Sequence, residues 1–267
     1  MEEMTVQDRP AFADRRRELI VELLRVHGTM ALRDLADRLR VSEVTVRRDV
    51  RILEAQGVLD RRRGGASLPG HRGPRRDDDA PSPELAAIAR TAATLVAEGD
   101  AIVLGPGEAV AALAAELVHR TGLTVVTNSL RAARILAEAP GVEVVVTGGT
   151  LRGAELALVG GAAEQALEGL RVRRAFVSGH GVTAERGVST ANAAVAGVDR
   201  ALADCAEEVI VLADHTRIGV DAVVQTVAPE YIGHLVTDSN ADPEVLLTLE
   251  DMGTTVHVAV PETDRGH

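Results

Sequence analysis

The feature that most constrains the fold is a series of short, uninterrupted apolar runs in the C-terminal two-thirds of the chain. Each run has about the length of a strand and is rich in β-branched residues, and the series reads "AIVLG", "LTVVTN", "VEVVVTGG", "RAFVSG", "EVIVLAD", "HLVTD" and "TTVHVAV". Helical stretches are expected between most of them, over residues 108–119, 130–137, 161–170, 191–205 and 243–252. This alternation predicts an α/β domain with a mostly parallel sheet covered by helices on both faces.

A stretch dense in Pro, Gly and charge precedes these runs. Residues 68–83, "LPGHRGPRRDDDAPSP", have no apolar periodicity and are typical of a linker. The linker divides the chain into a domain over residues 12–67 and a larger one over residues 84–260, which Ser82-Pro83 opens with a helix reaching Ala97. The chain is therefore expected to have two unequal domains.

The smaller domain has the pattern of three helices followed by a hairpin. Apolar positions at helical spacing indicate two helices that end near Gly28 and Arg40, and Ser42 is expected to cap a third that ends at Gly57. In the third helix Val44, Ile52 and Leu53 lie close to one helical face, which we expect to face inward. "VLDRRRGGAS" then predicts a β-hairpin. The order is that of an α+β winged helix-turn-helix, with the helix-turn-helix at about residues 29–48.

Composition narrows the classes of function. All 29 basic residues are arginine, so lysine chemistry such as a Schiff base is excluded. Residues 1–79 hold 17 arginines against 15 acidic residues, and the remainder holds 12 against 25. We therefore expect a polyanion, if one binds, at the N-terminal end.

Cys205 is the only cysteine, which excludes an intramolecular disulfide and suits a reducing compartment. No apolar stretch approaches the roughly 20 residues of a membrane span, so we expect a cytoplasmic protein without a membrane partner.

Outward-facing arginines point to double-stranded DNA as the partner. Thr45, Arg47, Arg48 and Arg51 are the polar candidates of the third helix, and Arg61, Arg62 and Arg63 those of the hairpin. Arginines on a helix in the major groove read guanine or bind phosphate. The alternative is a merely solvated helix face. The order of the helices and a basic hairpin at the right distance favour DNA binding.

Residues 15–67 resemble the N-terminal domain of the DeoR family of bacterial transcriptional regulators. The family's V-S-x-x-T-[IV]-R-R-D core is present as "VSEVTVRRD", and its G-x-[IL]-x-R-x-x-G-G-A wing as "GVLDRRRGGA". The resemblance implies that Ser42, Thr45, Arg47 and Arg48 contact an operator, that Arg61 to Arg63 serve the wing, and that the protein is a repressor. Ala31 departs from the Ser or Thr that often opens the second helix.

One such module covers only about 600–1,000 Å² of protein surface, which is too little for useful specificity for an operator. We therefore expect a homo-oligomer held by the C-terminal domain.

The resemblance continues to about residue 260. DeoR-type regulators carry a sugar-phosphate sensor domain similar to the ribose-5-phosphate isomerase fold, and its landmarks appear as "VTNS", "TGGTLR" and "LADHTRIG". Strand ends followed by such turns are where open α/β sheets bind ligands, although turns of this chemistry are common without one. The effector-binding residues implied are Gly107, Asn128, Gly148, Gly149, Arg152, Asp214 and Arg217, together with Glu108 and Asp199, which replace family residues.

Three departures fall within this set. The family's D-x-G-T-T is Gly105-Pro106-Gly107-Glu108-Ala109 here, its E-A-x-x-K places Asp199 where a lysine would stand, and Arg217 replaces another lysine. Two like charges at 4 Å repel by roughly 4 kcal/mol near a protein surface. Glu108 and Asp199 are therefore expected to repel a phosphate unless Arg152 or Arg217 compensates. This favours a cationic or neutral effector, or none, over an ordinary sugar phosphate.

Two other functions remain open at this point. A sugar-phosphate isomerase fused to a DNA-binding domain would use Asp214 and Glu108 as carboxylates, but it lacks a lysine and its phosphate loop is altered. A ligand-independent DNA-bridging oligomer would need only the first domain and self-association. The eight histidines form no motif with metal-ligand spacing. We expect no enzyme activity, no metal and no cofactor.

Overall fold

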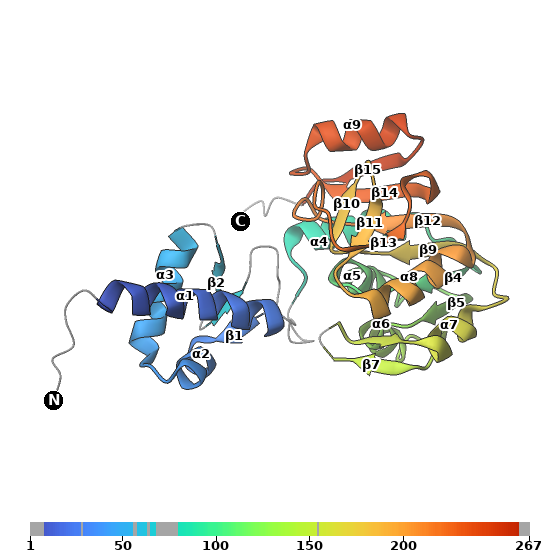
Figure 1. Ribbon diagram of the computed structural model, residues 1–267. Helices are drawn as coiled ribbons and strands as arrows, with labels where there is room; N and C mark the ends of the chain where they lie inside the picture. Colours follow the sequence, from blue (N-terminus) through green and yellow to red (C-terminus); the bar gives the residue numbers. More distant parts are fainter. Residues whose placement is uncertain are drawn as a thin grey trace, which may run out of the picture. The chain divides into compact units, whose positions relative to one another are not determined.

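The computed structural model describes residues 8–27, 29–55, 58–62, 65–67, 80–153 and 155–261. They fall into two compact units, residues 1–78 and 79–267 (Figure 1). Most of the expected linker, residues 68–79, and the glycines at positions 28 and 57 lie outside the described residues.

The first unit combines three helices with a small sheet. Its elements are α1 (Asp8–His27), β1 (Thr29–Ala31), α2 (Leu32–Leu39), α3 (Glu43–Ala55), β2 (Asp60–Arg62) and β3 (Gly65–Ser67). The strands are antiparallel in the order β1-β3-β2. The expected hairpin is β2–β3, whereas the three residues of β1 were not predicted. The winged helix-turn-helix architecture is confirmed.

The turn between α2 and α3 uses a left-handed residue. Arg40 has φ 54°, and the N–H of Val41 donates to the carbonyl of Ala36 at 3.1 Å, so the chain reverses within two residues. At the other end of α2, Ala31 supplies no side-chain cap. α2 is therefore held by its buried face, formed by Leu32, Leu35 and Ala36.

The second unit is built on a seven-stranded parallel sheet in the order β15-β14-β12-β9-β4-β5-β6. The strands are β4 (Ala101–Leu104), β5 (Leu123–Thr127), β6 (Val142–Val146), β9 (Val172–Val177), β12 (Ala206–Leu212), β14 (Ile232–Asp238) and β15 (Thr255–Ala259). Each overlaps one of the seven apolar runs, and β9, β12 and β14 begin two residues before theirs. The predicted fold class is confirmed.

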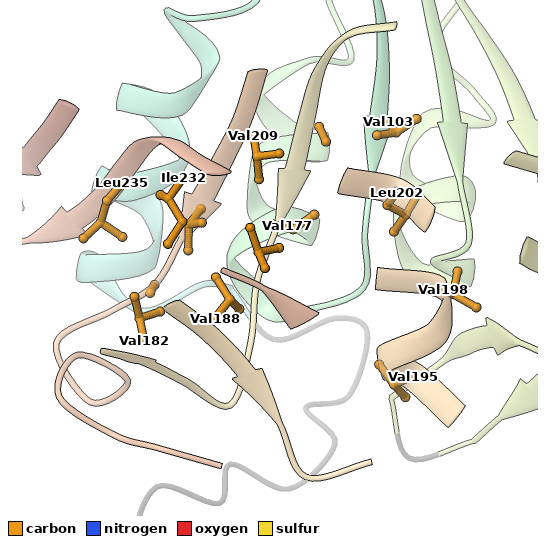
Figure 2. Packing of buried hydrophobic residues seen from close by; sticks show 14 of the residues in the cluster. Val103, Val177, Val182, Val188, Val195, Val198, Leu202, Val209, Ile232 and Leu235 are labelled. Carbon is orange, nitrogen blue, oxygen red and sulfur yellow. The ribbon is translucent and has the colours of Figure 1, made fainter. Parts of the chain in front are cut away.

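Helices of the described residues cover both faces of this sheet (Figure 1). Side chains of α4 (Pro83–Ala93), α5 (Glu108–Glu116) and α6 (Leu130–Leu136) pack with one set of strand residues, which includes Ile102, Phe176 and Ile210. Those of α7 (Gly161–Leu167), α8 (Ala193–Asp204) and α9 (Pro243–Asp251) pack with the alternate set, which includes Val103 and Val177 (Figure 2). The inner strands are buried on both faces, which explains why their sequences are apolar throughout. The edge strands β6 and β15 are exposed or half-buried over most of their length.

Two smaller sheets were not predicted. A three-stranded antiparallel sheet has the order β10 (Gly181–Thr183), β11 (Gly187–Thr190), β13 (Val224–Val227), and β7 (Thr150–Arg152) pairs with β8 (Ala157–Val159). α4 is also shorter than expected, because it ends at Ala93 rather than Ala97. No helix in the described part of the chain is long and apolar enough to cross a membrane.

Candidate functional site

The start of α3 is fixed by two hydroxyl groups. The N–H of Thr45 donates to Ser42 Oγ at 3.3 Å, and the hydroxyls of Ser42 and Thr45 lie 2.8 Å apart. This is the N-cap arrangement expected for Ser42. Both side chains are engaged with each other at the helix terminus that a recognition helix presents to DNA.

The arginines of α3 are exposed and differ in their partners. Arg47 forms an ion pair with Glu43 at 2.6 Å. Arg48 and Arg51 are exposed, and neither forms an ion pair with a described residue. The two guanidinium groups therefore carry uncompensated positive charge on the outer face of the helix.

A buried carboxylate holds this helix in place. Asp49 lies on the inner side of α3, where Arg16 of α1 donates to it at 2.5 Å and Arg17 lies 3.7 Å away. Val46 and Val50 are fully buried on the same side. Val44 is different: the expectation that it faces inward is wrong, because its side chain is 77% exposed.

The wing carries the remaining basic candidates. Arg61 and Arg62 lie in β2, where they are paired with Ala66 and Gly65 of β3. Arg63 lies outside the described residues. The role of all three in DNA binding stays a prediction.

The candidate effector residues lie mainly where the parallel strands end. β4 leads to β5 and β6 on one side, whereas β9, β12, β14 and β15 follow on the other, so the strand order reverses between β4 and β9. Ligands of open α/β sheets bind at such a reversal, beyond the carboxyl ends of the strands. The turns after β4 and β9 occupy that place.

These two turns are in contact. Gly107, which follows β4, has φ 132°, and a Cβ placed on it would lie 3.0 Å from Cβ of Ser178, which follows β9. Ser178 donates through its hydroxyl to the carbonyl of Leu212 at the end of β12, at 2.8 Å. The backbone conformation at position 107 therefore favours glycine, and a side chain there would also press against Ser178.

Glu108 is the first residue of α5, and no side chain caps this helix. A helix N-terminus carries a partial positive charge that stabilises an anion. The carboxylate of Glu108 thus lies in the first turn of the helix that an anionic ligand would otherwise approach.

The loop after β12 is joined to the loop after β9. Asp214 accepts from the N–H of Thr216 at 3.0 Å and from its hydroxyl. Arg217 donates through its guanidinium to the carbonyl of His180 at 3.3 Å. The N–H of Val182 in turn donates to the carbonyl of Arg217 at 2.9 Å. The structure therefore brings Asp214 and Arg217 to the same edge as Gly107.

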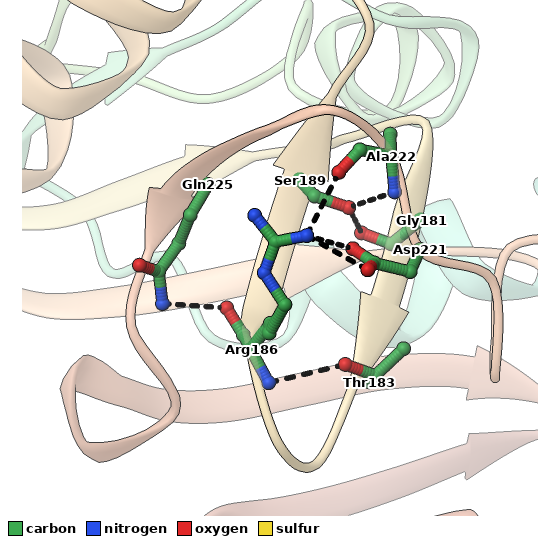
Figure 3. A network of polar contacts seen from close by, with 7 residues as sticks. All are labelled: Gly181, Thr183, Arg186, Ser189, Asp221, Ala222 and Gln225. Atoms are coloured by element: carbon green, nitrogen blue, oxygen red, sulfur yellow. Dashed lines mark hydrogen bonds and ion pairs between the residues drawn. The ribbon is translucent and has the colours of Figure 1, made fainter.

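A polar network holds the small antiparallel sheet beside this loop (Figure 3). Arg186 contacts both carboxylate oxygens of Asp221, at 2.9 and 2.7 Å, and its carbonyl accepts from Gln225 at 2.8 Å. Ser189 Oγ accepts from the N–H of Ala222 at 2.9 Å. These contacts fix the segment that follows Arg217 against β10, β11 and β13.

Asn128 and the glycine turn lie together at the hairpin β7–β8. The amide of Asn128 donates to the carbonyl of Leu158 at 3.1 Å, while its Oδ1 is buried and accepts no hydrogen bond from a described residue. Gly149 has φ 113°, and a Cβ placed on it would lie 2.8 Å from the carbonyl oxygen of Val159. Gly148, Gly149 and Arg152 are all exposed. Asn128 thus follows β5 and the glycine turn follows β6, and both lie next to the loop after β4.

Asp199 differs from the expectation. It is 3% exposed within α8, and no hydrogen bond from the described residues reaches its carboxyl. Burial raises the pKa of Asp199 from 3.8 to about 8, although the neighbouring Arg200 charge lowers it. At neutral pH this group is mainly a neutral carboxylic acid, so it lacks the charge that the expected repulsion of phosphate requires.

One polar pair at this edge was not predicted. His215 Nδ1 lies 3.0 and 3.1 Å from the two carboxylate oxygens of Asp238, and the backbone N–H of His215 donates to the same group at 2.7 Å. Burial alone would raise the pKa of Asp238, but the hydrogen bonds from His215 and Asn240 outweigh it and lower the pKa. The signal in the sequence was the position of Asp238 at the end of an apolar run, like Asp214.

The described residues contain no group of three or more His, Cys, Asp or Glu side chains placed to hold a metal ion. Cys205 is buried, and burial raises the pKa of its thiol. A buried, protonated thiol is a poor nucleophile.

Two family models match the chain. The DeoR-like helix-turn-helix domain matches residues 16–71, and the DeoR C terminal sensor domain matches residues 82–239. Each match falls within one of the two compact units.

Relatives match over nearly the whole length. The lactose phosphotransferase system repressor of Lactococcus lactis subsp. lactis is 30% identical over 239 residues, which are 87% of this chain and 93% of that protein. The HTH-type transcriptional repressor GlcR of Bacillus subtilis is 30% identical over 262 residues, 96% of this chain and 99% of the relative. Among solved structures, ribose 5-phosphate isomerase A of Methanocaldococcus jannaschii is similar with a TM-score of 0.38 and 18% identity, covering 50% of this chain and 53% of that one.

Proposed function

The chain belongs to the DeoR family of transcriptional regulators, and from this premise we propose how it represses transcription. α3 enters the major groove of an operator, the wing follows the DNA backbone, and an effector at the carboxyl edge of the parallel sheet controls the affinity. The proposal places the protein in the cytoplasm with its DNA. It assigns DNA binding to residues 12–67 and effector binding and self-association to residues 84–260, joined by a linker over residues 68–83.

The observation that carries DNA binding is the exposed arginine face of α3. Arg48 and Arg51 lack an ion pair among described residues, and the buried Asp49 contacts fix the opposite face of the helix. Arginines presented in this way bind guanine bidentately or contact phosphate. Arg48→Ala is expected to weaken operator binding by about 1–3 kcal/mol while affecting random DNA less. Fluorescence anisotropy with both DNAs tests this, and equal operator affinity for Arg47→Ala, Arg48→Ala and wild type would contradict it.

We propose a homo-oligomer held by the second unit. Two DNA-binding units on one assembly can read half-sites about one helical turn apart, which multiplies the specificity of a single module. Sedimentation at operator-binding concentrations is expected to show a dimer or larger species. A strict monomer that still binds its operator tightly would refute this part of the proposal.

For the effector we propose a neutral or cationic polyhydroxylated molecule rather than an ordinary sugar phosphate. The carboxylate of Glu108 already lies at the α5 N-terminus. The buried Oδ1 of Asn128 accepts no hydrogen bond from described residues, and an unmatched buried acceptor favours a ligand with a donor. The hydroxyl groups of a sugar or polyol supply such donors, and those of a sugar phosphate do so as well, so Asn128 favours a polyhydroxylated ligand without selecting against a phosphate. The neutral Asp199 removes one of the two expected repulsions, so this preference now depends on Glu108.

Calorimetric titration with matched pairs of polyols or sugars and their phosphates tests the effector class. The wild type is expected to bind the unphosphorylated member of a pair more tightly, and Glu108→Gln is expected to gain affinity for the phosphate. Micromolar binding of a sugar phosphate by the wild type would exclude this effector class. Operator affinity that no metabolite changes would support the ligand-independent alternative.

A further inference from the structure

An apolar side chain stands on the exposed arginine face of α3. Residues three, four and seven apart share one side of an α-helix, so Val44 lies on the same face as Arg47, Arg48 and Arg51. Val44 is 77% exposed, whereas Val46 and Val50 on the opposite side are fully buried. Val44 therefore takes no part in the core of the first unit.

The position of Val44 at the N-terminal end of α3 decides which part of the DNA its side chain can contact. It is the second residue of α3, after Glu43. The N-terminal residues of a recognition helix are those that reach base edges. The nearby polar groups are engaged locally, since Glu43 pairs with Arg47 and Ser42 with Thr45. The valine methyl groups are left as the apolar surface that this turn of the helix presents.

We infer that Val44 contacts the C5-methyl group of a thymine and so specifies one base of the operator. Thymine is the base that presents a methyl group in the major groove, and apolar side chains read it. The contact would remove the exposed valine and the thymine methyl from water together. This inference rests on the proposed function of α3 as the recognition helix.

Replacing thymine by uracil deletes the methyl group and keeps every hydrogen-bonding atom. Genomic fragments selected by the full-length wild-type chain give an operator, in which each thymine is then replaced by uracil in turn. The wild type is expected to bind about fourfold more weakly at one thymine of a half-site, the effect of losing roughly one buried carbon group. Val44→Ser is expected to bind the thymine and uracil operators equally, because it lacks the methyl groups.

Two control variants keep the test specific. Val44→Thr retains one methyl group and is expected to retain part of the discrimination. Val223→Ser makes the same change at a valine that is 80% exposed in the other unit, and it is expected to behave as the wild type. Circular dichroism confirms that each variant is folded.

The outcomes separate this inference from the function beneath it. Wild-type protein that binds its operator specifically but tolerates uracil at every thymine would overturn the role of Val44 and leave the role of α3 intact. A Val44→Ser variant that still binds the thymine operator more tightly than the uracil operator would also overturn the role of Val44 and leave the role of α3 intact. A wild type without sequence-specific binding would overturn both.

Discussion

At the scale of single residues, burial decides what Asp199 contributes. Its folded pKa of about 8 lies above the ordinary value of 3.8, so between these pH values the folded state holds a proton that the unfolded state has lost. Stability from this group is therefore lost progressively as the pH rises from about 4 to 8. The negative charge expected from the sequence is the charge that Asp199 carries in the unfolded chain. Its burial in the folded protein could not be predicted, because it depends on how α8 packs against several strands.

Asp199→Asn tests this at residue scale. Asparagine is isosteric and cannot ionise, so the variant is expected to match the wild type near pH 4 and to become more stable relative to it as the pH rises, by about 1.4 kcal/mol per unit at most. Denaturant unfolding followed at several pH values measures the difference.

The control lies in the same helix. Asp204→Asn changes an exposed carboxylate at the end of α8, and it is expected to follow the wild type at all pH values. A constant difference in stability between Asp199→Asn and wild type from pH 4 to 8 would show that Asp199 is ionised in the folded protein.

At the scale of elements, the turn between β6 and β7 depends on two adjacent glycines that differ in their surroundings. Gly149 has φ 113°, and a Cβ there would lie 2.8 Å from the carbonyl of Val159. Gly148 has φ 75°, and a Cβ would have nothing within 4 Å. A side chain at position 149 would therefore suffer both backbone strain and a steric clash. A side chain at position 148 would suffer backbone strain alone.

Gly149→Ala is therefore expected to destabilise the second unit by more than the roughly 1–2 kcal/mol of left-handed strain that Gly148→Ala incurs. Chemical unfolding of the two variants side by side measures the difference. Equal losses would mean that the hairpin β7–β8 moves to accommodate the methyl group.

The elements also show which parts of the fold a sequence can predict. The inner strands of the parallel sheet were predictable because residues such as Val103 and Ile102 are buried on opposite faces, which makes each run apolar throughout. The edge strands β6 and β15 were predictable from β-branched runs although they are exposed or half-buried over most of their length. The sheet β10-β11-β13 was not, because its strands have three or four residues and its order depends on a segment that returns from beyond β12. Val44 was misplaced because its spacing fits the edge of the apolar face, and only packing against α1 and α2 decides where that face ends.

The candidate site was predictable to a similar extent. Turns after β4, β5, β6 and β12 could be located from the ends of apolar runs, and the structure places Gly107, Asn128, Gly149 and Asp214 there. Ser178 and the His215–Asp238 pair were missed, because contacts between loops of non-consecutive strands leave no local pattern. Side-chain roles in binding DNA or an effector stay predictions.

At the scale of the whole molecule, charge is distributed unequally between the two units. Residues 1–79 carry a slight excess of arginine, and the remainder carries 25 acidic residues against 12 arginines. DNA binding through the first unit releases counterions from phosphates, while the acidic second unit is repelled by the polyanion.

Operator affinity is therefore expected to fall steeply with salt. If an assembly neutralises about 6–10 phosphates, the affinity drops by about 10³- to 10⁵-fold between 50 and 200 mM salt. Arg51→Ala is expected to reduce the slope of log affinity against log salt if this arginine contacts a phosphate. A titration at several salt concentrations measures both, and an affinity independent of salt would exclude an electrostatic interface.

Selection of genomic DNA fragments by the purified full-length protein, followed by footprinting, shows whether α3 reads an operator sequence. We expect the wild type to enrich a small set of fragments that share a site, with protected half-sites about one helical turn or a multiple apart. The Arg47→Ala and Arg48→Ala variants are expected to lose that enrichment while remaining folded. Fragments recovered without a common site, or recovered equally by these variants, would contradict the assignment of α3 as the element that reads DNA.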